Sequence, residues 1–186
     1  MSRPRSFWGG VAIVRLVLAL LLCLGLGAQD SVVVFLRHAE KTHRGSTARL
    51  SSMGQRRAIS LSADLAPFQP VALFASDLPR TQQTLEPFSK DSGLPIQIYD
   101  RGSEWALGRS LLVRYAGKTV VVCGHSDTLM DLVRSLGHPT PFPEVSGFDR
   151  FWVLRVIEPG GAVTLEEHMQ RPLPPRGRNS PSRNTP

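Results

Sequence analysis

The chain has 186 residues, and its formal net charge of +7 is concentrated at the two ends. Residues 1–27 hold three arginines and residues 171–186 hold four, so the 143 residues from 28 to 170 carry 15 Lys and Arg against 15 Asp and Glu. Because this body is formally neutral, the composition gives no support for a nucleic-acid-binding domain.

The N-terminal segment has the layout of a secretory signal peptide. Arg3, Arg5 and Arg15 precede an almost unbroken apolar run from residue 16 to residue 26, and small residues follow it. This run spans only about 16 Å as a helix, too short for a hydrocarbon core of about 30 Å. We therefore expect residues 1–27 to be removed, the protein to be exported to the periplasm or the extracellular space, and no stable membrane anchor to remain. An uncleaved anchor is the alternative.

The mature chain is expected to be one domain that packing alone holds together. Residues 28–170 are enough for a proper core. Cleavage leaves Cys123 without a disulfide partner, and its apolar surroundings favour a buried, inert thiol over a nucleophile. The tail, residues 171–186, has five prolines and no apolar residue beyond Leu173, which predicts disorder.

Strand and helix signals alternate along the body. Buried strands are predicted at the short apolar runs 32–36, 71–75 and 119–123, and a short strand at 96–99. Helices are predicted from Ser51 or Ser52 to before Pro67, from Pro79 to a kink or an end at Pro87, and over 104–115 and 129–136. A closing pair of strands is predicted at 151–157 and 162–165. This order predicts an α/β fold, a three-layer α/β/α sandwich with a mostly parallel sheet.

Cations and imidazoles follow three of the predicted strands. Arg37 and His38 follow the first, Arg80 lies just beyond the second, and His125 follows the fourth. Because the carboxyl ends of parallel strands meet at one edge of a sheet, these side chains are expected to lie together. Two guanidiniums can bind a dianionic phosphoryl group, one neutral imidazole can attack phosphorus, and the other can stabilise charge on the equatorial oxygens. Two structural histidines are the alternative interpretation.

No metal or cofactor is expected at this edge. His38 and His125 have no carboxylate or cysteine at ligand spacing, and the adjacent arginines repel a cation. Asp77, which precedes the helix that carries Arg80, is expected to cap that helix rather than to act as a base.

Four segments of the chain resemble, in order, the landmarks of the histidine phosphatase superfamily, also called phosphoglycerate mutase-like. The segments are Leu36-Arg37-His38-Ala39-Glu40-Lys41, Leu50-Ser51-Ser52-Met53-Gly54-Gln55, Ser76-Asp77-Leu78-Pro79-Arg80-Thr81-Gln82-Gln83-Thr84 and Val122-Cys123-Gly124-His125-Ser126. Together they cover roughly residues 32–151. Agreement of all four in order makes chance similarity very improbable.

The resemblance implies roles for five residues. His38 is the residue that becomes phosphorylated, Arg37 and Arg80 hold the phosphate, and His125 completes the pocket. In many members the proton donor is a glutamate between the second arginine and the second histidine, which here points to Glu104. In another branch it is an aspartate directly after the second histidine; that position is Ser126 here, so Asp127, displaced by one, is the alternative.

The predicted function is that of an exported, metal-independent phosphomonoesterase that works through a phosphohistidine. Its expected substrate is a phosphorylated small molecule, envelope sugar or protein, and no nucleic-acid partner is expected. A mutase on the same fold is one alternative, and a non-catalytic module that binds phosphate or a phosphosugar is another. The presence of His38 argues against the module, because binding alone needs no nucleophile. Substrate and oligomeric state stay open.

Overall fold

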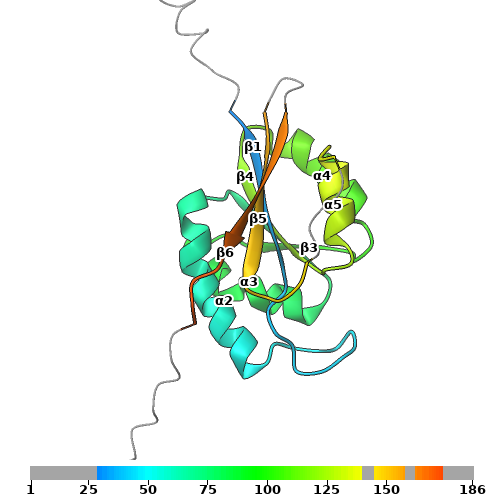
Figure 1. Ribbon diagram of the computed structural model, residues 1–186. Coiled ribbons are helices and arrows are strands. Elements are labelled where there is room, and N and C mark those ends of the chain that lie inside the picture. The colour runs from blue at the N-terminus through cyan, green and yellow to red at the C-terminus, as the bar shows by residue number, and fades with distance from the viewer. Residues whose placement is uncertain (1–28, 140–144, 158–161, 174–186) are drawn as a thin grey trace, which may run out of the picture.

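The computed structural model describes residues 29–139, 145–157 and 162–173, and Figure 1 shows their arrangement. The predicted signal peptide, and the predicted tail beyond residue 173, lie outside these ranges. In the described parts of the chain, no helix combines the length and apolarity needed to cross a membrane.

Strands and helices follow the predicted order. The strands are β1 (Ser31–Arg37), β2 (Ala72–Ser76), β3 (Ile96–Tyr99), β4 (Thr119–Gly124), β5 (Arg150–Val156) and β6 (Val163–Met169). The helices are α2 (Ser52–Leu65), the short 3₁₀ helix η1 (Ala66–Phe68), α3 (Pro79–Ser92), α4 (Glu104–Arg114) and α5 (Leu129–Ser135).

The described strands form one sheet in the order β3-β2-β4-β1-β5-β6. The first four are parallel, and β5 and β6 are antiparallel to their neighbours. Helices cover both faces, with α2 and α3 on one and α4 and α5 on the other (Figure 1). The predicted three-layer α/β/α sandwich with a mostly parallel sheet is therefore confirmed.

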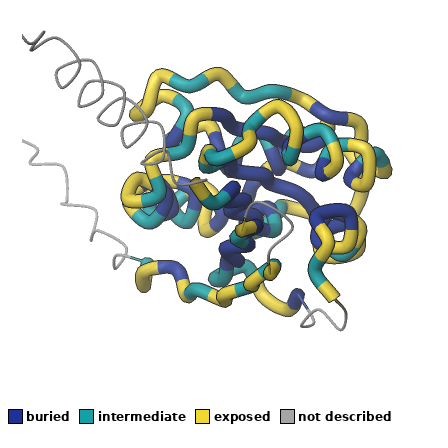
Figure 2. The backbone as a smooth tube through the Cα atoms, turned by 90° about the horizontal axis from the view of Figure 1, so that it is seen from above, coloured by how far each residue is buried: buried dark blue, intermediate teal, exposed yellow. Residues whose placement is uncertain are grey.

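Each face of the central strands contributes to its own apolar core. In β1, Val33 and Phe35 pack into the core beneath α4 and α5, whereas Val34 and Leu36 pack into the core beneath α2 and α3. This alternation is the two-residue period of a strand covered on both sides. Figure 2 shows the buried strands running between the helical layers. Cys123 is buried among them, as predicted, and burial raises the pKa of its thiol.

The ends of α2 agree with the prediction. Ser51 is the N-cap, and its side chain accepts a hydrogen bond of 3.2 Å from the Gly54 amide. The helix ends at Leu65, before Pro67. Beyond β6, the Arg171 Nε donates to Asp64 Oδ1 near the end of α2 at 2.7 Å.

Two expectations about α3 need correction. Of the two outcomes predicted at Pro87, an end is wrong and a kink stays a prediction: the helix continues to Ser92, because Leu85 and Phe88, on either side of the proline, are buried in the core against the sheet. Asp77 is not its cap: the N-cap is Leu78, and Asp77 Oδ1 instead accepts a 3.2 Å hydrogen bond from the backbone amide of Arg101. Asp77 therefore links the end of β2 to the turn after β3.

Candidate active site

The two histidines lie side by side because β1 and β4 are paired neighbours. The register places Arg37 opposite Gly124, so His38 and His125 each follow a paired position directly. The His38 amide donates to the Gly124 carbonyl at 3.0 Å, and the two imidazole centroids are 5.3 Å apart. The sheet brings together the two histidines that the sequence predicted to meet.

A pocket of about 410 Å³ lies at this edge of the sheet. Its lining residues are Arg37, His38, Lys41, Gly45, Arg80, Arg101, His125, Ser126 and Asp127. We call Arg37, His38, Arg80 and His125 the pocket floor, and Lys41, Arg101 and Asp127 the pocket rim. The structure thus brings four of the five predicted site residues to one pocket.

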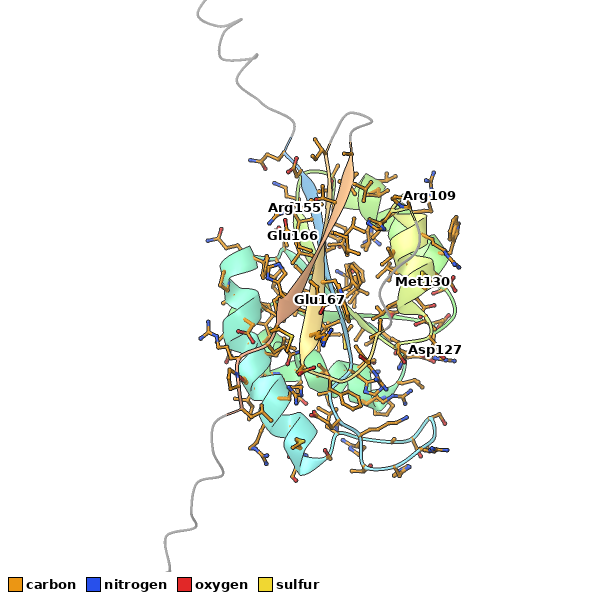
Figure 3. The ribbon with its side chains drawn as sticks, viewed as in Figure 1. Arg109, Asp127, Met130, Arg155, Glu166 and Glu167 are labelled. Carbon is orange, nitrogen blue, oxygen red and sulfur yellow. The ribbon has the colours of Figure 1, made fainter. Side chains whose placement is uncertain are left out.

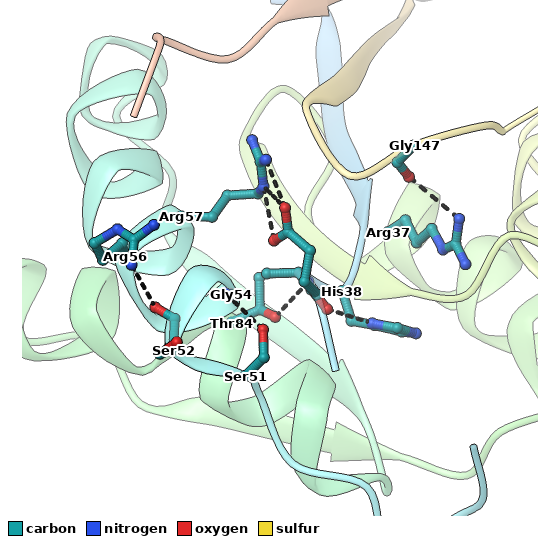
Figure 4. Close-up of polar contacts among 11 residues, drawn as sticks. Arg37, His38, Ser51, Ser52, Gly54, Arg56, Arg57, Thr84 and Gly147 are labelled. Atoms are coloured by element: carbon teal, nitrogen blue, oxygen red, sulfur yellow. Dashed lines mark hydrogen bonds and ion pairs between the residues drawn. The ribbon is translucent and has the colours of Figure 1, made fainter. Parts of the chain in front are cut away.

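His38 is held in a form suited to nucleophilic attack. Its ring is 3% exposed, and Nδ1 lies 2.7 Å from the Ala39 carbonyl oxygen (Figure 4). Because a carbonyl can only accept, Nδ1 carries the proton and Nε2 keeps its lone pair. Burial lowers the pKa of His38 to about 4; the hydrogen bond to Ala39 opposes this shift, and the charges of Arg80 and Arg37 reinforce it. His38 is therefore neutral at pH 7.

His125 is fixed from both sides of its ring. Arg80 Nη2 lies 3.3 Å from its Nδ1, and a guanidinium can only donate, so Nδ1 accepts. Nε2 must then carry the proton and donate to Ser76 Oγ at 2.8 Å. The Ser76 hydroxyl donates onward to Thr81 Oγ1, 2.9 Å away, and Thr81 donates to the Leu78 carbonyl at 2.7 Å. Burial, followed by the charge of Arg80, lowers the pKa of His125 to about 3.

The two floor arginines are anchored by backbone carbonyls. Arg80 is 7% exposed and donates from Nη1 to the Gly45 carbonyl at 3.2 Å. Arg37 donates to the Gly147 carbonyl at 3.2 Å, and its guanidinium carbon lies 4.3 Å from the centre of the Phe148 ring. Both guanidiniums are thereby held in place before any anion binds.

Glu40 belongs to the scaffold and not to the pocket. Arg57 of α2 binds its carboxylate with both Nε and Nη2, at 2.6–2.9 Å (Figure 4). The Ser51 amide donates to the Glu40 carbonyl at 2.8 Å, and a Cβ on Gly54 would lie only 2.2 Å from that same oxygen. This close approach explains the Ser-Ser-Met-Gly segment: a glycine lets the start of α2 pack against the backbone that follows His38.

The two candidate proton donors are placed differently. Glu104 is 1% exposed and does not line the pocket; its Oε2 accepts a 2.8 Å hydrogen bond from the Gly102 amide, within the turn between β3 and α4. Asp127 lines the pocket and forms an ion pair with Arg101. Glu104 is therefore the one predicted site residue that the structure does not bring to the pocket.

Sequence reasoning missed several residues around the histidines. Ser76 supports His125, Phe148 contacts Arg37, and Lys41 and Arg101 add two cations to the pocket. Lys41 is the last residue of the first landmark, and Arg101 lies in a Gly-Ser turn at the end of a strand, so both carried a positional signal. The signal was weak because a charged residue in a turn is most often only solvated.

Two further searches of the described structure bear on the site. A larger hollow, of about 570 Å³, lies between α2 and α3, but no histidine, arginine or cysteine lines it. Among the described residues, no group of three or more His, Cys, Asp and Glu side chains is placed to hold a metal ion.

Comparisons with known proteins agree with the resemblance. Residues 33–111 match the sequence model of the histidine phosphatase superfamily (branch 1). This span includes three of the four landmarks and ends before His125. No curated protein sequence matches the chain.

Solved structures share the fold at low sequence identity. A protein histidine phosphatase SixA complexed with tungstate has a TM-score of 0.60 and 20% identity, covering 75% of this chain and 96% of its own. A mycobacterial glucosyl-3-phosphoglycerate phosphatase has a TM-score of 0.58 and 14% identity, with coverages of 75% and 97%. A phosphoserine phosphatase from Entamoeba histolytica in complex with 3-phosphoglyceric acid has a TM-score of 0.57 and 12% identity, with coverages of 76% and 98%.

Proposed function

Taking the chain as a member of the histidine phosphatase superfamily, we propose that it hydrolyses phosphomonoesters through a phosphohistidine at His38. The observation that carries the proposal is the contact between His38 Nδ1 and the Ala39 carbonyl, which leaves Nε2 unprotonated beside two anchored guanidiniums. The structural neighbours named as phosphatases support the same reaction class.

In the first step, Nε2 of His38 forms a bond to phosphorus while the bond to the ester oxygen breaks. Arg37 and Arg80 neutralise the dianionic phosphoryl group. When Arg80 turns to the phosphate, Nδ1 of His125 loses its hydrogen-bond donor. A proton that Nδ1 takes from solvent as the dianion binds lets His125 donate to an equatorial oxygen, and this proton returns to solvent when inorganic phosphate leaves. The leaving oxygen takes its proton from a carboxylic acid.

In the second step, water attacks the phosphohistidine. The P–N bond breaks, inorganic phosphate leaves, and the carboxylate of the first step accepts the proton of the attacking water. His38 and the acid thus return to their starting forms, and no oxidant or reductant is consumed.

We propose Asp127 as this acid in preference to Glu104. Asp127 lines the pocket, whereas the Glu104 carboxylate accepts from the Gly102 amide inside a turn and does not line it. The role of Glu104 as donor rests on the resemblance alone. Because Asp127 is paired with Arg101, its donation requires Arg101 to turn toward the bound substrate first.

A nucleophile variant with a matched control tests the reaction. His38→Ala should lower kcat on p-nitrophenyl phosphate by several orders of magnitude, whereas His43→Ala, which changes an exposed histidine outside the pocket, should keep the wild-type rate. Rapid quenching of the wild type with labelled substrate should trap a phosphate adduct that is labile to acid and stable to base. Wild-type turnover in His38→Ala would end the phosphohistidine proposal.

The same measurements separate the two alternatives. A mutase would form the adduct but pass the phosphoryl group to a second hydroxyl of the substrate skeleton in preference to water. A non-catalytic module would bind inorganic phosphate without forming an adduct at all. Release of inorganic phosphate at the rate of ester cleavage is the result that we expect.

We also propose that the protein is exported and acts on a phosphorylated small molecule, sugar or protein. Export rests on the signal-peptide pattern of residues 1–27. The substrate range is supported by two neighbours, one named for a small phosphorylated molecule and one for phosphohistidine on protein. Mass spectrometry of the purified protein should give a mature chain that begins near residues 27–29; an intact N-terminus would favour a retained anchor.

A further inference from the structure

Two threonines of α3 lie close to Arg80 in sequence, and their contacts lead to different histidines of the pocket. Thr81 is bonded to Ser76, which in turn supports His125. Thr84 lies one helical turn beyond Arg80 and is 1% exposed. Its hydrogen bonds lead toward His38 instead, through the backbone that follows this residue.

The Thr84 hydroxyl connects α3 to the segment after β1. It donates to the Arg80 carbonyl at 2.7 Å, so its single proton is used within the helix. A lone pair of the same oxygen accepts from the Ala39 amide at 3.0 Å (Figure 4). Both bonds are buried. One oxygen atom therefore joins the residue after the nucleophile to the backbone of the arginine that holds the phosphate.

The Ala39 amide needs a side-chain partner because secondary structure does not supply one. Residues 38–40 follow β1 and belong to neither a helix nor a strand. Ala39 is 1% exposed, so water does not replace a missing partner there. An amide left unpaired in such a place is costly. Thr84 therefore has a strong hold on the position of Ala39.

The carbonyl of Ala39 contacts the nucleophile itself. Its oxygen lies 2.7 Å from Nδ1 of His38, and this contact keeps the ring proton on Nδ1 and leaves Nε2 free. As Nε2 forms its bond to phosphorus, the ring gains positive charge. A carbonyl aimed at the Nδ1 proton stabilises this charged ring more than the neutral one. The direction of the Ala39 carbonyl therefore matters most in the transition state.

We propose that Thr84 is a positioning residue for the nucleophile: by holding the Ala39 amide, it directs the Ala39 carbonyl to Nδ1 and so fixes the reactive tautomer of His38. This inference rests on the proposed function, because His38 is taken to be the nucleophile. With Thr81 acting on His125 through Ser76, α3 orders both histidines as well as carrying Arg80.

Nitrogen NMR of labelled histidines measures the tautomer directly, and the His38 signals are assigned by their loss in His38→Ala. In the wild type the proton should lie on Nδ1. Thr84→Val keeps the size and branching of the side chain but removes the acceptor of the Ala39 amide, so a mixture of tautomers is expected. Thr84→Ser restores the hydroxyl and should restore the single tautomer. A wild-type tautomer in Thr84→Val would overturn the proposal.

Kinetics on p-nitrophenyl phosphate gives a second readout. Thr84→Val should lower kcat at least about tenfold and change KM less than about twofold, because Arg37 and Arg80 still hold the phosphate while the nucleophile is misaligned. Thr84→Ser should return kcat to within about twofold of the wild type. A raised KM with an unchanged kcat would show that Thr84 acts on phosphate binding and not on the nucleophile, contrary to the proposal.

The control removes a different buried hydroxyl that also bonds a carbonyl of its own helix. Ser135 of α5 is 3% exposed and donates to the Leu132 carbonyl at 2.6 Å. This helix, which carries Met130 in Figure 3, packs on the opposite face of the sheet from α3. Ser135→Ala should lower the free energy of unfolding but keep the wild-type kcat and tautomer. An equal loss of kcat in Ser135→Ala would attribute the effect to destabilisation and disprove positioning by Thr84.

Thr84→Cys replaces Thr84→Val if the valine variant does not fold. A thiol is a weaker acceptor than a hydroxyl, so the tautomer and kcat should change in the same direction and by less. Wild-type values of both in Thr84→Cys would then reject the proposal.

The tautomer does not depend on turnover, so this inference and the proposed function can fail separately. A His38 tautomer that responds to Thr84 in a protein without phosphatase activity would leave the control of His38 by Thr84 standing and reject the phosphatase. An active phosphatase in which neither the tautomer nor kcat responds to Thr84 would do the reverse.

Discussion

The pocket floor and the pocket rim are built from different kinds of interaction. On the floor, His38 and His125 are each 3% exposed, and three of their four ring nitrogens are hydrogen-bonded, leaving Nε2 of His38 for the substrate. At the rim, Arg101 and Asp127 are exposed and bonded chiefly to each other. Burial sets the charge states of the floor, whereas solvent and salt compete at the rim. The difference teaches that the groups of the floor are fixed by the fold, whereas those of the rim are free to exchange partners.

The assignment of Asp127 as the acid is the strongest test of this contrast between floor and rim, because Asp127 lies at the rim and yet would take part in the reaction. Asp127→Asn should slow an alkyl phosphate roughly 10²-fold while sparing p-nitrophenyl phosphate, whose leaving group departs without a proton. Rates on the two esters check this. Glu104→Gln should keep the ratio of the two rates, since an amide oxygen can still accept from Gly102. A loss of the alkyl ester in Glu104→Gln alone would return the role of acid to Glu104, as the resemblance implied.

Ser76 tests how far a buried hydrogen bond controls the pocket floor, because it binds His125 without itself lining the pocket. Ser76→Ala removes the acceptor of the His125 Nε2 proton and should lower kcat about tenfold, with little change in KM. Nitrogen NMR of labelled histidines should show Nε2 of His125 protonated in the wild type and a mixture of tautomers in the variant. Ser76→Thr, which restores a hydroxyl, should recover the single tautomer. An unchanged tautomer in Ser76→Ala would show that Arg80 alone fixes the ring.

The smallest expected effect is that of lowering the pH on the fraction of His38 that is neutral. A pKa of His38 near 4 means that lowering the pH from 7 to 5 leaves its nucleophilic nitrogen free, so less than a twofold loss of the neutral form is expected; an ordinary histidine would be mostly protonated at pH 5. Proton NMR titration of the imidazole signals checks this directly. A midpoint near 6.5 would show that burial does not control the floor.

The same shift affects stability. His38 binds a proton below pH 4 in the folded chain and below about 6.5 in the unfolded one, so the unfolded state holds more protons between these values. The contribution of the neutral, buried imidazole to the free energy of unfolding is therefore fully present above about pH 6.5 and falls as the pH drops toward 4. Lowering the pH from about 6.5 toward 4 should therefore lower the free energy of unfolding, which denaturant titrations at several pH values check.

The floor was predictable from the sequence, whereas at the rim only Asp127 was named as a candidate site residue. Apolar runs that stop at Arg37-His38 and at Gly124-His125 mark strand ends, and the parallel fold fixes where such ends meet. Glu104 and Asp77 show the limit of reasoning from sequence position: Glu104 was assigned from its place between Arg80 and His125 in the resemblance, and Asp77 from its place before a helix, yet both accept from amides of the turn after β3. Which amide a turn directs toward a carboxylate depends on tertiary structure. The same two hydrogen bonds, from the Arg101 amide to Asp77 and from the Gly102 amide to Glu104, hold the turn that places Arg101 at the pocket.

The pairing of β1 with β4 has a further consequence. The separation of the two imidazoles, 5.3 Å between centroids, is close to the spacing of about 4.8 Å between neighbouring strands in any sheet. Backbone hydrogen bonds between β1 and β4 therefore fix how far apart the main-chain positions of His38 and His125 lie, so that this spacing belongs to the sheet and not to the two side chains.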